Sequence, residues 1–524
     1  MNASGSRRWW GLAALALSAL VVGLDITVLN VALPTLATAL RADTGDLQWI
    51  ANSYNLALAA ALLPAGLLGD RFGRRRLLLG ALVVFAAASV ACAYAGSVGW
   101  LIAARGLLGL AAAAVLPLCM SLLPTLFGPQ ERTRALAVWV TANGIGIPLG
   151  PIVGGWLLDN FWWGSVFLIN VPVIAAALVA GALLLPESRA ADAPRLDLAG
   201  VALSSAGLVA VTYGAITAGG HGLRDASALA ALAGGVLLLA AFVAWQRRAG
   251  RAGRTPLVDL ALFRSRAFTW SVLLVTVVTF AMFGALFTLP QYFQAVRHAD
   301  ALGAGLRLLP VVGGLIVGAR LAGRLAPRTG PRAPVCAGLA VLAVGMAAGT
   351  TTGLATGYAM VAGWLAVTGV GMGLVLSGGM DAALGSLPPE RSGAGSALIQ
   401  ALRQVGGTLG VALLGSVLNT AYRDHLALPG APGPVVAAVR ESAPAGVLVA
   451  SRLGDPALLI AVRSAFVSGM TATLWVCAAV ALAGAALAAL FLPGRAPRRP
   501  EPAPPAVRVG SGTAQAGQLP GSGG

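Results

Sequence analysis

The sequence predicts an all-α integral membrane protein with fourteen transmembrane helices. Of its 524 residues, 58% are hydrophobic and only 10% are charged, whereas a soluble domain carries roughly 25% charged residues. The mean hydropathy is +0.84. Fourteen apolar runs each reach the roughly 20 residues that cross the hydrocarbon core of a bilayer. The short alternating segments of a membrane β-barrel are absent from the sequence.

The apolar runs cover most of the chain and are separated by polar segments. Because their number is even, both termini should lie on the same side of the membrane. The predicted helices are at roughly 10–34, 48–69, 77–96, 98–122, 135–158, 165–185, 198–219, 227–245, 268–290, 303–323, 334–353, 357–379, 394–419 and 465–492.

The distribution of arginine predicts which side that is. All 35 basic residues are arginines, and the net charge is +17. With the N-terminus in the cytoplasm, 24 arginines fall in cytoplasmic loops and tails, seven in outer loops and four within helices. This asymmetry is the positive-inside pattern, with the basic loops facing anionic lipid. We therefore expect a multi-pass protein of the cytoplasmic membrane with both termini in the cytoplasm, and no nucleic-acid partner.

The most charged turn joins the second and third predicted helices. Its glycines allow close backbone approach and a tight turn. Its carboxylate can sit against the positive N-terminal end of another helix. We expect a conformational latch in which, if the chain folds as two bundles, Asp70 meets the start of the thirteenth helix, around 391–393. A solvated basic turn is the alternative. The residues of this latch are Gly66, Asp70, Arg71, Gly73 and Arg74.

Five motifs resemble the major facilitator superfamily and, within it, the fourteen-helix drug/proton antiporters. One is the charged turn itself, and another is the helix 4 motif at 101–113, where Leu108 replaces the usual glutamine. The remaining three are LDITVLNVALP at 24–34 (helix 1 of the fourteen-helix branch), GIPLGPIVGG at 146–155 (helix 5 of antiporters) and WGSVFLINVP at 163–172 (quaternary-ammonium and methyl-viologen exporters).

This resemblance implies the major facilitator fold, with two six-helix bundles plus two inserted helices. The expected segments are 1–190 for the N-terminal bundle, 191–267 for the inserted helices and a basic connector, 268–493 for the C-terminal bundle, and 494–524 for a disordered cytoplasmic tail.

The C-terminal bundle contains a long outer loop, 420–464. Asp455-Pro456 reads as an N-cap followed by a first-turn proline, so the last helix should start there, outside the lipid. The apolar pieces within 433–453 predict a hairpin or short amphipathic helices over the outer mouth. A disordered loop is the alternative.

Asp25 and Arg105 are the candidates for proton coupling. Asp25 is the only acid well inside a predicted helix of the first half. A charge at this depth costs about 2.5–3.5 kcal/mol on insertion scales, so it should face the protein interior. Burial disfavours its charged form and would let it load and release a proton. Arg105 is the natural partner, and purely structural pairing of the two is the alternative.

The fifth predicted helix carries a seam of small residues. Glycines that recur every four residues allow tight contact with another helix, and two prolines remove backbone donors. Such a seam could open on one side of the membrane and close on the other. Its members are Gly146, Pro148, Gly150, Pro151, Gly154 and Gly155.

The candidate substrate contacts are polar and aromatic residues on helices that should line a central cavity. Core packing is the alternative for the aromatic ones. Exporters of dications often have an acid near position 52, so asparagine there favours monovalent cations or neutral amphiphiles. The candidates are Asn52, Tyr54, Asn55, Trp139, Asn143, Phe280, Phe283, Phe287, Gln291, Gln400 and Arg403.

The predicted function is proton-coupled antiport that exports hydrophobic, cationic or neutral drugs by alternating access. Proton-coupled uptake and export of a single endogenous metabolite are the alternatives. We expect no enzymatic activity, because the three histidines, His221, His298 and His425, fall in predicted outer loops, and the sequence shows no paired intramembrane acids and no nucleophile setting. We also expect no metal and no cofactor beyond the proton gradient. The expected partners are small-molecule substrates, protons and membrane lipid, with the protein acting as a monomer.

Overall fold

The computed structural model describes residues 3–127, 129–189, 197–222, 224–252, 256–258, 260–387, 392–426, 428 and 433–494. Throughout these residues the chain is helical, with short turns and no strands. The all-α prediction is therefore confirmed. The predicted tail beyond residue 494 lies outside the described residues.

Residues 3–184, here called the N-terminal half, form helices that pack mainly on one another. Helix α1 packs against α5 and α7, and α2 packs against α4. The bounds are α1 (Ala3–Ala39), α2 (Thr44–Phe72), α3 (Arg74–Ala93), α4 (Val98–Leu126), α5 (Pro129–Asn160), α6 (Ser165–Leu168) and α7 (Asn170–Leu184).

Two further helices, α8 (Leu198–His221) and α9 (Ala226–Arg251), pack against each other. Asp197 holds them together at one end. Its carboxylate accepts hydrogen bonds from Gly200 N at 2.9 Å, from Trp245 Nε1 at 2.9 Å and from Gln246 Nε2 at 2.8 Å. The same side chain thus caps α8 and fixes the end of α9.

Residues 266–491 are here called the C-terminal half. A short 3₁₀ helix, η1 (Leu260–Arg264), leads into it. Its members are α10 (Arg266–Gln291), the π-helix η2 (Tyr292–Val296), α11 (Ala301–Arg307), α12 (Leu309–Thr329), α13 (Arg332–Gly349), α14 (Tyr358–Gly385), α15 (Ser392–Leu409), the π-helix η4 (Gly410–Leu414), α16 (Gly415–His425), α17 (Gly433–Glu441), α18 (Ala443–Leu453) and α19 (Pro456–Phe491).

The described helices include one at each of the fourteen predicted positions. Twelve are long and apolar enough to cross a membrane, and α2 makes a thirteenth if its bent segments form one span. Helix α5 lies at the remaining position. The bend in α2 is 53° and falls between Leu62 and Pro64, where the proline lacks the N–H that would continue the helix. The chain is thus a multi-pass membrane protein.

The prediction of short helices within 433–453 is confirmed, because these residues form α17 and α18. The predicted start of the last helix is also correct. The Asp455 carboxylate accepts hydrogen bonds from Ala457 N at 2.9 Å and Leu458 N at 3.1 Å, and Pro456 is the first helical residue.

Two predicted helices differ from continuous α-helices. The predicted 394–419 helix contains η4 and continues to His425, and the predicted 303–323 helix is divided at Leu308 into α11 and α12. Pro310 follows this division and lacks a backbone N–H, which favours a new helix start there.

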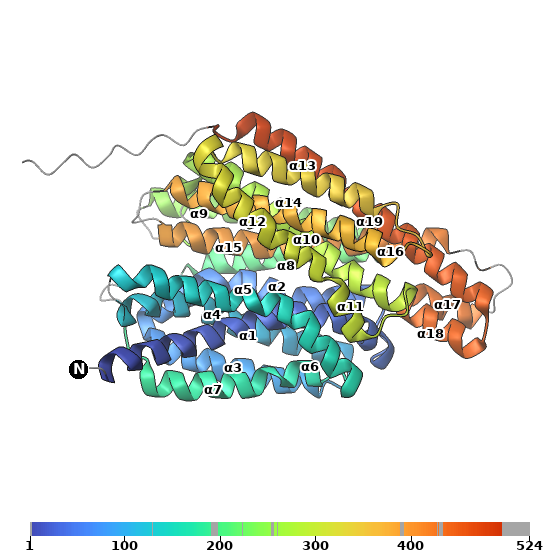
Figure 1. The fold of residues 1–524 in the computed structure, drawn as a ribbon, viewed down its shortest axis with the longest axis horizontal. Helices are drawn as coiled ribbons and strands as arrows, with labels where there is room; N and C mark the ends of the chain where they lie inside the picture. The colour runs from blue at the N-terminus through green and yellow to red at the C-terminus, as the bar shows by residue number, and fades with distance from the viewer. Residues whose placement is uncertain are drawn as a thin grey trace, which may run out of the picture.

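The two halves lie side by side, with α11, α17 and α18 at the end farthest from the N-terminus (Figure 1). We call this the distal end and the opposite one the proximal end. At the distal end the Asp159 carboxylate accepts hydrogen bonds from Ala301 N at 3.1 Å and Leu302 N at 3.0 Å. Gln294 Nε2 donates to Val31 O at 2.8 Å, and Thr44 Oγ1 donates to the backbone of α17. The described hydrogen bonds between the halves therefore close the distal part of the molecule.

Candidate functional site

A buried carboxylate with two partners lies at the centre of the N-terminal half. Asp25 on α1 is fully buried, and Arg105 on α4 is 1% exposed. Arg105 Nη1 lies 2.7 Å from Asp25 Oδ2, and Asn170 Nδ2 on α7 donates to Asp25 Oδ1 at 2.9 Å. Asn170 Nδ2 also reaches Ser89 Oγ on α3 at 3.3 Å. Four helices thus hold one carboxylate in a dry environment, where a change in its charge has a large electrostatic effect.

Tyr54 and Gly109 fix the position of Arg105. The guanidinium carbon lies 4.5 Å from the centroid of the Tyr54 ring, which suits a cation–π contact. A Cβ at Gly109, one helical turn after Arg105, would collide with the backbone of Tyr54. Glycine at this position therefore lets α4 approach α2 closely enough for Arg105 to lie over the ring.

The glycine seam of α5 packs against the segment of α1 that carries Asp25. A Cβ at Gly146 would lie 2.7 Å from Leu20 O, and a Cβ at Gly150 would collide with Thr27 Oγ1. The seam therefore forms a close helix contact within the N-terminal half. Gly155, by contrast, faces Leu302 on α11, in the C-terminal half.

A family comparison identifies this architecture. The model of the Major Facilitator Superfamily matches residues 15–411. The chain belongs to the major facilitator superfamily.

Three relatives from this superfamily match most of the chain. The tetracenomycin C resistance and export protein of Streptomyces glaucescens is 37% identical over 97% of this chain and 96% of its own length. The multidrug efflux pump LfrA of Mycolicibacterium smegmatis is 36% identical over 92% of this chain and 96% of its own length. The methyl viologen resistance protein SmvA of Salmonella typhimurium is 30% identical over 88% of this chain and 93% of its own. The similar superfamily members are thus resistance and efflux proteins.

The fold is also found among solved structures. A bacterial homolog of the human lysosomal transporter Spinster, in an inward-facing and unoccupied conformation, aligns with a TM-score of 0.67 at 17% sequence identity. The alignment covers 94% of this chain and 99% of the other. This likeness agrees with the major facilitator fold.

The charged turn at 66–76 makes its described contacts with the N-terminal half and with the segment that follows α7. Asp70 accepts from Arg74 Nε at 2.9 Å and from its Nη2 at 2.8 Å. Gly73 has a φ of +105°, a conformation that favours glycine. The Glu187 carboxylate accepts hydrogen bonds from Arg75 N at 3.1 Å and from Arg76 N at 3.2 Å, in the first turn of α3. The predicted partner at 391–393 lies at the edge of the described residues, and Arg391 lies outside them.

The candidate substrate residues separate into packed and polar groups. On α10, Phe283 lies against Gly407, where a Cβ would be 3.1 Å from the ring, and Phe287 is fully buried. Gln291 Nε2 donates to Phe287 O at 2.7 Å, within the same helix. Trp139 is buried on α5. These side chains contribute to packing in this conformation, as does the partly buried Phe280.

The polar candidates lie on α2 and α15. Asn52 and Asn55 on α2 are buried. On α15, Arg403 Nη1 donates to Gln400 Oε1 at 3.2 Å. The side chains of Asn143 and Pro148 on α5 lie outside the described residues, although the helix includes both.

The sequence patterns did not point to several residues that contact the predicted site residues or join the two halves. Asn170 was part of a motif but had no assigned role, and Glu187, Gln48 and Asp159 were not singled out. The available signal for Asn170 was an amide within an apolar run, which needs a buried partner.

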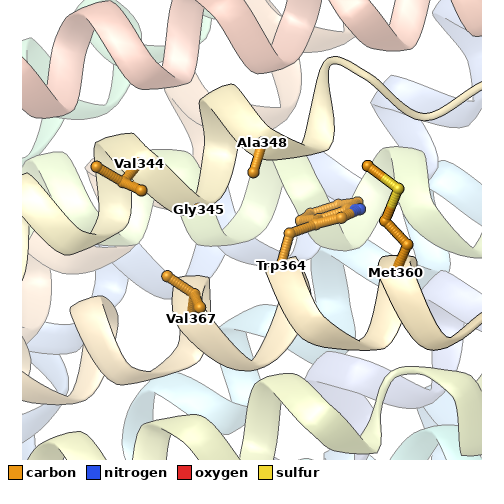
Figure 2. Close-up of a pocket in the computed structure, with 6 residues that line it drawn as sticks. All are labelled: Val344, Gly345, Ala348, Met360, Trp364 and Val367. Atoms are coloured by element: carbon orange, nitrogen blue, oxygen red, sulfur yellow. The ribbon is translucent and has the colours of Figure 1, made fainter.

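A separate apolar pocket of about 260 Å³ lies between α13 and α14. Figure 2 shows side chains of both helices facing this space, with the Trp364 ring on one side. The indole N–H of Trp364 donates to Thr352 Oγ1 at 3.1 Å. None of the predicted site residues lines this pocket. Among the residues with assigned structure, no cluster of His, Cys, Asp or Glu could hold a metal ion.

Proposed function

We propose that the protein is a proton-coupled antiporter that exports hydrophobic, drug-like amphiphiles by alternating access. The supporting observation is the buried Asp25 carboxylate, which is held by Arg105 and Asn170 next to the α5 seam. Proton-coupled antiport is the usual mechanism in this branch of the superfamily, and the similar proteins are named for export and resistance.

The proposed membrane orientation places both termini in the cytoplasm. It rests on the excess of arginine in the loops of the proximal end. The distal end is then the outer side, and the hydrogen bonds of Asp159, Gln294 and Thr44 close the outer exit. We place the protein in the cytoplasmic membrane as a monomer, with residues 1–190 and 268–493 as its two bundles and 191–267 as an insertion.

Protonation of Asp25 would change the charge at the centre of the first bundle. The ionised carboxylate and Arg105 together carry no net charge, and protonation leaves Arg105 without its counter-charge. The carboxylate then loses the ionic part of its contact at 2.7 Å. Because α1 carries Asp25 and packs on the α5 seam, this change acts at a close helix contact. We infer that it biases the two bundles between outward-open and inward-open arrangements.

The charged turn at 66–76 would act at the cytoplasmic end of the same cycle. Asp70 and Arg74 form a half-buried ion pair beside the start of α3. When the cytoplasmic side closes, we expect Asp70 to meet the N-terminal end of α15 in the other bundle. An Asp70→Asn variant should then impair transport without abolishing substrate binding.

Asp25→Asn tests the proposed function directly. Growth inhibition in an efflux-deficient host would be measured for monocations, dications and neutral antibiotics. We expect wild-type protein to protect against some of these compounds and Asp25→Asn to lose that protection. Removing one partner of a buried pair costs about 3–5 kcal/mol, so membrane expression is measured in parallel. An Asp25→Asn/Arg105→Gln double variant removes the unpaired charge and should also be inactive.

The control is Asp424→Asn, which neutralises an exposed acid in the last turn of α16 and should remain fully active. Full protection by a normally expressed Asp25→Asn variant would refute the role of Asp25. Sensitisation of the host by wild-type protein would instead indicate uptake.

A further inference from the structure

Two polar stripes face each other where α2 meets α15. Gln48 and Asn52, with Asn55, are spaced by four and three residues, so they share one face of α2. Gln404 and Thr408 share one face of α15 in the same way. Gln48 Nε2 donates to Val411 O at 3.2 Å and to Ala412 O at 3.0 Å, just beyond Thr408.

These bonds set the register of the two helices. The two helices run antiparallel. Asn52 and Asn55, which follow Gln48 along α2, therefore lie opposite residues that precede Val411 in the sequence. Those residues include Thr408 and Gln404. The two stripes therefore lie at the same depth between the two halves, in the first half of α2 and the last turns of α15.

Five polar atoms of these stripes are buried without hydrogen-bond partners. Asn52 is 0% exposed, and neither its Nδ2 nor its Oδ1 has a partner. Asn55 Oδ1, Gln404 Oε1 and Thr408 Oγ1 are also unpartnered, and all three residues are at least nine-tenths buried. Buried polar groups without partners are rare in folded proteins and call for an explanation. Such a cluster indicates that a ligand or water satisfies these groups in another conformation.

The stripes contain both donors and acceptors, and they contain no acid. The sequence has no Asp or Glu between 47 and 69 or between 394 and 419. The nearest charge on the same stretch of α15 is the guanidinium of Arg403, whose Nε is also buried and unpartnered. An organic cation would therefore meet a positive charge and no carboxylate.

We propose that these stripes form the polar part of the substrate site, and that the site takes uncharged amphiphiles bearing hydroxyl and carbonyl groups rather than organic cations. This inference rests on the proposed export function and specifies its substrate class. A hydroxyl group can donate to Asn55 Oδ1 or Gln404 Oε1, and a carbonyl can accept from Asn52 Nδ2 or Arg403 Nε. In the present conformation, closed at the distal end, the stripes are covered by each other, and separation of α2 from α15 would expose them.

The test measures equilibrium binding of two probes to purified, full-length protein. One probe is an uncharged dihydroxyanthraquinone, which carries hydroxyls and carbonyls, and the other is ethidium, a permanent cation of similar size. We expect wild type to bind the uncharged probe about tenfold or more tightly than ethidium, and Asn52→Leu and Gln404→Leu to weaken its binding by a similar factor. Gln404→Glu should shift the preference towards ethidium.

Thermal unfolding gives an independent readout of the same variants. Replacing an unpartnered buried amide by leucine removes a destabilising group, so Asn52→Leu should raise the melting temperature while it weakens binding. If the Asn52 amide served only to stabilise the fold, Asn52→Leu would have a lower melting temperature than wild type. The matched control is Asn419→Leu. Asn419 is also buried and its Oδ1 is also without a partner, but the residue faces α8, where its Nδ2 donates to Gly219 O at 3.3 Å. Probe binding should therefore be unchanged.

Two results would overturn the inference. One is unchanged binding of the uncharged probe in both leucine variants, and the other is tighter binding of ethidium than of the uncharged probe by wild type. Neither result affects the export function, which the Asp25→Asn growth assay decides separately. Conversely, the growth assay could show no export while the leucine variants still weaken probe binding. These residues would then form a ligand site in a protein that does not export.

Discussion

At the scale of single residues, the important feature is that both oxygens of Asp25 are engaged. Oδ2 faces Arg105 and Oδ1 accepts from Asn170. A proton that binds this carboxylate must therefore weaken one of two existing interactions. Asn170 lies 145 residues after Asp25 in sequence, and no local pattern links the two residues.

Asn170→Ala should destabilise the protein through Asp25. A hydrogen bond to a charged group contributes about 1.5–3 kcal/mol, so the melting temperature of the purified protein should fall by several degrees. In a double-mutant cycle, Asn170→Ala should cost much less in an Asp25→Asn background, because the ionised acceptor is already absent.

Asn419→Ala provides the comparison for this cycle, since Asn419 bonds to α8 and does not contact Asp25. Its effect should add to that of Asp25→Asn. Simple additivity for Asn170 as well would show that its bond to Asp25 contributes nothing to stability.

At the scale of helices, the close contact between α1 and α5 depends on glycines, which have no side chain. Gly146, Gly150 and Gly154 all lie where a Cβ would press on α1. The four-residue repeat predicted a close helix contact, and the structure confirms one. The repeat could not show that the partner is α1, because spacing identifies a face of a helix and not what covers it.

Gly150→Ala should impair transport. The added methyl group would meet Thr27 Oγ1 and lie 2.9 Å from Leu24 O, so α1 must move away from α5. Overpacking of this kind costs about 1–3 kcal/mol. Because the strain falls next to Asp25, we expect transport in proteoliposomes to fall about tenfold, the factor that corresponds to 1.4 kcal/mol.

Gly106→Ala is the matched control. It is also a glycine within a membrane helix, but a Cβ there meets nothing within 4 Å. This variant should transport normally and be at least as stable as wild type, since alanine favours helix. Equal transport by the two variants would show that the α5 seam does not take part in the cycle.

At the scale of the whole molecule, the sequence was sufficient to predict where the helices lie along the chain. It was insufficient to predict which helices pack against each other. Apolar length located the fourteen helical positions, and Asp455-Pro456 located the start of α19. The π-helices of α10 and α15 had no sequence signal, because one extra residue per turn hardly alters an apolar pattern. Contacts between the halves, such as Gln48 with Val411, depend on packing of distant segments that periodicity does not encode.

The hydrogen bonds at the distal end and the buried Asp25 carboxylate together describe one conformation of a transporter that alternates between two. In this state Asp159 and Gln294 join the two halves at the distal end, and the polar stripes lie where α2 meets α15. A proton gradient can drive such a transporter only if a change in the charge of Asp25 alters the populations of the two conformations.

The most direct test of that claim is the collapse of a proton gradient by a transported compound. Inside-out vesicles containing the protein would be energised to acidify their interior, and a compound against which the protein confers resistance would be added. Our account predicts that wild-type vesicles lose part of the gradient on each addition and that Asp25→Asn vesicles do not respond. An equal response from Asp25→Asn vesicles, or no response from wild type, would contradict it.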